Sequence, residues 1–188
     1  MIIIRPTASL AKRMKEKLES TADSSTTRMG DWYANDIVLC RKQFILCVSS
    51  TSRLAVILEA APYMSFPDRL SDAVSEVLRA IGVEEGNIQE EREQMNEFKL
   101  AKTANKSILG SLNEYRFQLE AHTYMGRIDF SEPLEMSLHL SKTISLVLPE
   151  GYPRDAALKI FGQTPPKSES GPPTTSPVQL RPKLYLVK

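Results

Sequence analysis

Three consecutive strand-like runs constrain the fold of this chain more than any other feature. Residues 32–40, 44–49 and 54–59 are rich in aliphatic, β-branched and aromatic side chains, and short polar turns separate them. Strands joined by such short turns pair antiparallel with their neighbours in sequence. The three runs therefore predict a β-meander. Shorter strand-like stretches at residues 2–4 and 98–102 raise the expected number of strands to four or five.

Helical periodicity occupies much of the remaining chain. Apolar residues recur every three or four positions over residues 67–81, where Pro67 suits the first turn and Gly82 closes the pattern. Similar patterns predict further helices at residues 9–18, 106–124, 133–142 and 153–161. The acidic stretch 84–97 is typical of a solvated helix or loop. We therefore expect an α+β fold, a small antiparallel meander sheet with helices packed mainly on one face.

Composition divides the chain near residue 162. Residues 1–162 are expected to form a single domain, whereas half of the chain's 12 prolines lie in residues 163–188. A segment so rich in proline and serine cannot bury enough apolar surface to offset its ordering entropy, so it is expected to be a flexible tail. Residues 184–187 alternate like a strand and can add to a sheet edge. The tail is thus a candidate contact for a protein partner or a homo-oligomer.

The charge balance excludes some classes of function. Lys and Arg number 24 and Asp and Glu number 23, which gives a net charge of +1 and does not support nucleic-acid binding. No apolar run approaches the roughly 20 residues of a membrane span, and the apolar N-terminal stretch is too short for a secretion signal. We expect a cytoplasmic protein without membrane association.

The two cysteines and two histidines predict no metal site, because their spacing fits no ligand set. A hairpin turn near residues 41–43 would place Cys47 opposite Asp36 or Ile37, away from Cys40. Both thiols are therefore expected to be reduced and buried. No cofactor is predicted.

The first polar motif is Gly-Asp-Trp-Tyr-Ala-Asn at residues 30–35. Strand alternation places Asp31, Tyr33 and Asn35 on one face, where a carboxylate, a phenol and an amide can bind a polar ligand. The alternative is structural: Gly30 makes a turn, Asp31 caps backbone N–H groups and Trp32 lies in the core.

The second polar motif lies where the strand at 98–102 leads into the helix at 106–124. Its polar side chains are those of Lys102, Thr103, Asn105, Lys106 and Ser107. Such a junction offers backbone N–H groups and the positive end of the helix dipole to an anion. Gly110 and Asn113 share a helical stripe with Lys106. The alternative is that Asn105 or Thr103 is simply a helix cap.

Both motifs resemble those of a family of small bacterial proteins classed only as a domain of unknown function. The resemblance covers roughly residues 1–162 and rests on the motifs at 30–35 and 101–113, on the opening strand with its basic helix, and on an arginine-led turn, here Arg41. It adds Arg41 to the candidate ligand-binding residues. It implies no activity.

Two classes of function follow. The first is a non-catalytic module that binds a partner protein or an anionic ligand through both motifs. The second is a small enzyme for a phosphorylated or nucleotide-like substrate, with Asp31 as base and Lys102 and Lys106 holding the anion. No nucleophile motif or metal set is visible, which favours the first. Either class predicts that Asp31 or Asn35 lies within reach of Lys106, Asn105 or Asn113.

Overall fold

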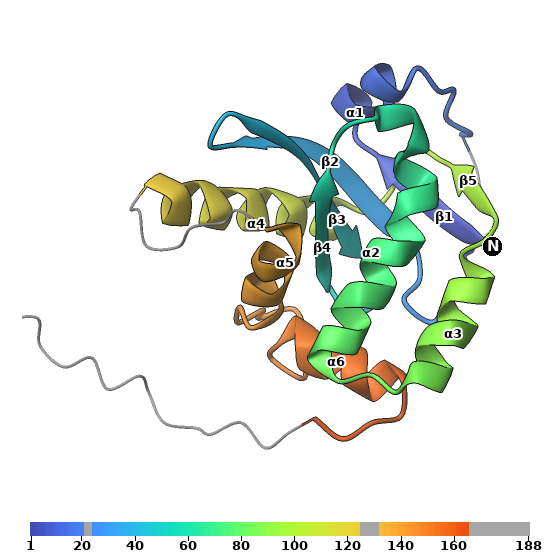
Figure 1. The fold of residues 1–188 in the computed structure, drawn as a ribbon, viewed down its shortest axis with the longest axis vertical. Helices are drawn as coiled ribbons and strands as arrows, with labels where there is room; N and C mark the ends of the chain where they lie inside the picture. Colours follow the sequence, from blue (N-terminus) through green and yellow to red (C-terminus); the bar gives the residue numbers. More distant parts are fainter. Residues whose placement is uncertain (21–23, 125–131, 166–188) are drawn as a thin grey trace, which may run out of the picture.

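The computed structural model describes residues 1–20, 24–124 and 132–165. Its centre is a five-stranded sheet in the order β4-β3-β2-β1-β5 (Figure 1). The strands are β1 (Ile2–Pro6), β2 (Trp32–Leu39), β3 (Lys42–Ser49), β4 (Ala55–Glu59) and β5 (Phe98–Leu100). Strands β2, β3 and β4 form the expected antiparallel meander, but β1 runs parallel to both β2 and β5. The sheet is therefore mixed rather than wholly antiparallel.

The connection between β1 and β2 explains the parallel pairing. It contains α1 (Ala8–Met14), and a crossover with a helix returns the chain so that the next strand runs in the same direction. The three isoleucines of β1 are all buried, as is common for a strand in a parallel arrangement. Helix α1 begins after Thr7, whose hydroxyl accepts a hydrogen bond from Leu10 N, and ends at Met14 because Lys15 is left-handed. It is thus shorter than the predicted 9–18.

Helices cover both faces of the sheet, and the expectation that they pack mainly on one face is wrong. One face packs against α1, α2 (Phe66–Ile81), α3 (Glu85–Gln94) and α6 (Pro153–Ile160). The other packs against α4 (Lys106–Tyr124) and α5 (Pro133–Ser141) (Figure 1). The cause lies in β3, where all six residues after Gln43 are buried. A strand that is apolar on both faces needs a cover on each.

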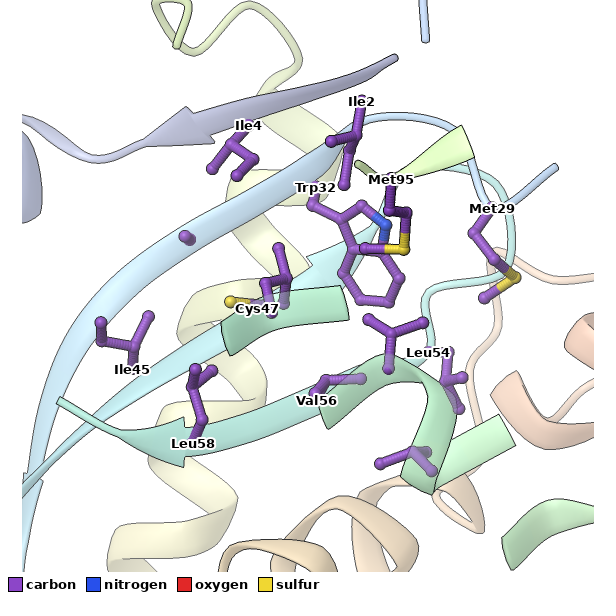
Figure 2. Close-up of a cluster of buried hydrophobic side chains, with 14 of the residues drawn as sticks. Ile2, Ile4, Met29, Trp32, Ile45, Cys47, Leu54, Val56, Leu58 and Met95 are labelled. Atoms are coloured by element: carbon purple, nitrogen blue, oxygen red, sulfur yellow. The ribbon is translucent and has the colours of Figure 1, made fainter. Parts of the chain in front are cut away.

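Trp32 is at the centre of the larger apolar cluster. It is wholly buried, and Figure 2 shows its indole among Ile2, Met95, Cys47 and Leu54. The next residue, Tyr33, belongs to the cluster on the opposite face. The alternation predicted for the first motif is therefore confirmed for these two residues.

The β2–β3 hairpin is tighter than expected. Leu39 pairs with Lys42, so the turn consists of Cys40 and Arg41, both of them left-handed. Cys47 consequently lies opposite Ala34, not opposite Asp36 or Ile37. Both thiols are free, as predicted, but Cys40 is exposed because it occupies the turn instead of the strand.

A buried carboxylate fastens α3 to the loop before β2. Glu91 is only 2% exposed, and its carboxylate accepts hydrogen bonds from Arg28 N at 2.9 Å and Met29 N at 3.0 Å. Burial raises the pKa of Glu91 above its ordinary value. Sequence patterning did not separate Glu91 from its solvated acidic neighbours, because its partners are backbone groups distant in sequence.

Glu91→Gln should lower the free energy of unfolding by about 1–3 kcal/mol, since an amide offers one acceptor oxygen and turns an NH₂ group towards a backbone N–H. Urea denaturation followed by the emission of Trp32, the single tryptophan, measures the effect. Glu93→Gln, on the exposed side of α3, is the control and should change stability by less than about 0.5 kcal/mol. Equal stability of the two variants would contradict an anchoring role for Glu91.

Candidate functional site

The side chain of Asp31 is engaged in the fold. Arg5 Nε donates to Asp31 Oδ2 at 2.6 Å, and Ser25 donates to Oδ1 through its hydroxyl at 2.7 Å and its backbone N–H at 3.3 Å. A general base needs a lone pair within reach of a substrate proton. The bonds to Arg5 and Ser25 instead make Asp31 a link between β1, β2 and the loop before β2.

The two motifs meet through Tyr33 and Arg5. Asn105 N donates to the Tyr33 hydroxyl at 3.1 Å, and Arg5 Nη1 donates to the carbonyl oxygen of Lys102 at 2.7 Å. Asn35 lies one strand period further on and accepts a hydrogen bond from the Thr7 hydroxyl at 2.8 Å. The motifs are adjacent, but Asp31 and Asn35 are not the residues that connect them within the described chain.

Asn105 caps α4, which was the structural alternative for the second motif. Its Oδ1 accepts hydrogen bonds from Ser107 N at 2.9 Å and Ile108 N at 3.4 Å. These donors are therefore occupied and do not form an open cradle for an anion. Lys102 and Lys106 are exposed, and neither forms an ion pair with a described residue.

Three candidate residues lie away from this junction or contribute little to it. Arg41 is in the β2–β3 turn, at the opposite end of β2 from Asp31, because the register pairs Trp32 with Ser49 and Leu39 with Lys42. Thr103 is half-buried in the connection between β5 and α4, and Asn113 is exposed further along α4. The structure therefore does not bring Arg41 to the other candidates.

Gly30 allows the β3–β4 turn to approach β2 closely. Its φ is +70°, and a Cβ on this residue would lie 2.4 Å from Ser50 Oγ and 2.9 Å from Thr51 Cγ2. Asp31 N donates to Ser50 Oγ, and Ser50 N donates to the Asp31 carbonyl, each at 2.8 Å. The first motif therefore holds the turn that carries Arg53.

Two hydrogen bonds, one to its backbone and one to its side chain, fix Arg53 in this turn. Its carbonyl accepts a hydrogen bond from the Tyr115 hydroxyl at 3.1 Å, and its Nη2 donates to Ser107 Oγ at 3.2 Å. Both partners lie on α4. The residue has a left-handed φ of 60°, a conformation that costs a non-glycine residue energy.

The guanidinium of Arg53 lacks an ionic partner among the described residues. It is half-buried, and its Nη1 is shielded from solvent without a hydrogen-bond acceptor. Burial lowers the pKa of Arg53 from its ordinary value. A polar atom shielded from water is usually hydrogen-bonded, so the Nη1 of this residue needs a reason.

Arg53 lines a hollow of about 440 Å³ between the β3–β4 turn and α6. The other lining residues are Thr51, Val147, Leu148, Pro149, Glu150, Ala156, Lys159 and Ile160. Lys159 Nζ is paired with Glu150 Oε1 at 2.7 Å, which leaves Arg53 as the lining cation without a described carboxylate. A cation without a carboxylate partner in a partly apolar lining suits an anionic group carried on an apolar body.

A second hollow, of about 600 Å³, adjoins the first and shares Val147 with it. It lies between α4 and residues 144–147. Gly110 faces this hollow, and a Cβ there would meet no atom within 4 Å. Close packing is therefore not the reason for a glycine at this position of α4.

Sequence reasoning missed Arg53 and the positioning role of Tyr115. Arg53 stands in a Ser/Thr-rich turn outside both motifs, and Tyr115 was assigned only to the apolar stripe of its helix. The signal that was available is Gly30, which was interpreted only as a turn residue, although a glycine can also mark a close approach of another segment. Which segment approaches depends on the hairpin register.

Two further searches concern only the described parts of the chain. No group of three or more His, Cys, Asp or Glu side chains there could hold a metal ion. In the same residues, no helix combines the length and apolarity that crossing a membrane requires.

Comparison with known proteins gives one match. Residues 3–156 match a family model described as Domain of unknown function (DUF6933), a range that includes both motifs and Arg53. No curated protein and no solved structure gives a significant match to the chain.

Gly30→Ala should destabilise the protein more than Gly151→Ala. Gly151 also has a positive φ, +79°, but a Cβ there meets nothing within 4 Å, so its substitution measures the backbone cost alone, about 1–2 kcal/mol. The clash with Ser50 should add a further 1–3 kcal/mol or so at Gly30. Denaturation curves of the two variants test this, and equal losses would show that the β3–β4 turn does not depend on the close approach.

Proposed function

We propose that this chain, which belongs to the DUF6933 family of domains of unknown function, is a non-catalytic binding module for a small ligand that carries an anionic group on an apolar body. The observation that supports the proposal most is that the half-buried guanidinium of Arg53, which has no ionic partner among the described residues, lines a partly apolar hollow. We also propose that the module works in the bacterial cytoplasm, as the resemblance and the two free thiols suggest.

Electrostatics favours an anion as the ligand. A cation that is removed from water without a partner is costly, and a carboxylate or phosphate oxygen offsets that cost with charge-assisted hydrogen bonds. Nη1 carries two N–H donors that have no acceptor in the described structure. In our proposal the guanidinium turns these Nη1 donors to a ligand oxygen in the hollow, while Ser107 Oγ holds Nη2.

The size and lining of the hollow favour a small molecule with an apolar part. A volume of about 440 Å³ lies within the usual range for small-molecule sites. Val147, Pro149 and Ile160 supply apolar walls.

The engagement of the motif side chains argues against catalysis. Asp31 was the candidate base of the enzyme alternative, and its carboxylate is bonded to Arg5 and Ser25. In our proposal the first motif positions the turn that carries Arg53, and the second supplies Ser107 and the cap of α4.

Hexanoate should bind the wild-type protein and hexanol should bind at least tenfold more weakly, because only the carboxylate pairs with Arg53. Arg53→Gln should weaken hexanoate binding by at least tenfold, a loss of about 1.4 kcal/mol. Arg41→Gln, a matched arginine at positive φ on the exposed hairpin turn, should leave binding unchanged. Calorimetric titration measures all four pairs. Equal binding of hexanoate and hexanol, or equal effects of the two substitutions, would contradict the anion site.

Arg53→Met should raise the stability of the unliganded protein by roughly 1 kcal/mol, since it removes an unpaired, half-buried charge and loses only one hydrogen bond. Arg41→Met shares the positive φ but not the burial, so it should change stability by less than about 0.5 kcal/mol. Urea denaturation at constant ionic strength measures both variants. A loss of stability in Arg53→Met larger than in Arg41→Met would mean that Arg53 serves the fold.

A further inference from the structure

Residues 144–147 expose an unusual amount of apolar surface beside the second hollow. Ile144 is 62% exposed, Leu146 97% and Val147 58%. Across the hollow lies a stripe of α4 formed by Ser107, Gly110, Ser111 and Glu114. Single exposed apolar residues are common, but three within four positions at the rim of a hollow indicate an interaction surface. We call this surface the α4 groove.

We propose that the α4 groove is the docking site of residues 180–188 of the same chain. This segment lies outside the described residues, and so do the flexible tail and the strand-like terminus predicted from the sequence. It contains two leucines, a tyrosine and a valine in succession at 184–187, and it carries three basic residues and no acidic one. Glu114 is the charged residue that lines the groove in the described structure, so the charges are complementary.

The segment can reach the groove without a second chain. The described chain ends at residue 165, just after α6, and α6 lines the hollow next to the groove. At roughly 3.1 Å per residue in an extended proline-rich chain, residues 166–183 span up to about 56 Å. A domain of this size is about 40 Å across, from its expected radius of gyration. A tether of this kind gives an effective concentration near the millimolar range, which favours docking within one molecule.

The sheet edges are less suitable docking sites than the groove. At the β4 edge, Ile57 N donates to Ser137 Oγ of α5 at 2.9 Å. At the β5 edge, the Leu100 carbonyl accepts a hydrogen bond from Glu19 N at 2.9 Å. Both edges are thus partly occupied, whereas nothing in the described residues covers Leu146.

Photocrosslinking in the full-length chain tests the proposal. Replacement of Leu146 by p-benzoyl-L-phenylalanine should, after irradiation, give a product of monomer mass in which position 146 is joined to a peptide containing residues 184–187. The same replacement at Met64, which is 70% exposed on the η1 turn (Tyr63–Ser65), is the control and should not capture that peptide. Leu184→Ser with Leu186→Ser should reduce the yield at least fivefold, and Gln179→Ser should not.

Each other result overturns the inference. A product of dimer mass would assign the groove to a second copy. Capture of the tail at both 146 and 64, or at neither, would show that the groove does not select it. The inference is independent of the anion site, because the crosslink is expected equally in Arg53→Gln.

Discussion

The side chain of Arg5 joins three segments on which the candidate site depends. Its Nε pairs with Asp31 and its Nη1 reaches the carbonyl of Lys102, so β1, the start of β2 and the entry to α4 are held together. Its guanidinium also lies 6.0 Å from the centre of the Tyr33 ring. The pair with Asp31 is largely shielded from water, where removal of either partner is costly. The junction thus lies at the entry to α4, whose first turn meets the β3–β4 turn through Ser107 and Arg53.

The site consists of residues that position Arg53 and of Arg53 itself, whose hydrogen-bond donors are not all paired. Gly30, Tyr115 and Ser107 fix the backbone and side chain of Arg53, and their polar groups are paired in doing so. Of these four residues, Arg53 is the one that keeps a buried donor without an acceptor in the described structure. The positive φ and the unpaired charge of Arg53 both lower the free energy of unfolding. Ligand binding gives a reason why the fold contains such a residue.

Local sequence patterns predicted the helices and strands well, but they could not predict which elements pair or pack with one another. The apolar stripe at 67–81, its proline and Gly82 identified α2 almost to the residue, because periodicity and capping are local. The same logic found β2, β3 and β4. It did not reveal that β1 runs parallel to its neighbours, because strand direction depends on the crossover through α1. It also did not reveal that helices cover both faces of the sheet, because that depends on where α4 packs.

The candidate site follows the same rule. Both motifs were recognised and do lie together, yet the residues that join them are Tyr33 and Arg5, and Arg41 is at the other end of the sheet. Arg53 could not be found from sequence, since its environment is assembled from the β3–β4 turn, α4 and α6. Gly30 in the first motif reflects this environment, because the absence of a side chain leaves room for Ser50 and Thr51.

The most direct test of the account is the NMR signal of the Arg53 guanidinium during a titration with hexanoate. The account predicts that the Arg53 Nε and Cζ resonances shift in a saturable way and that rotation about the Cζ–Nη bonds slows, as charge-assisted bonds form. The resonances of Arg41, in the same spectrum, should stay in place. Unchanged Arg53 resonances at saturating hexanoate, or equal shifts at both arginines, would contradict the claim that Arg53 is held unpaired for an external anion.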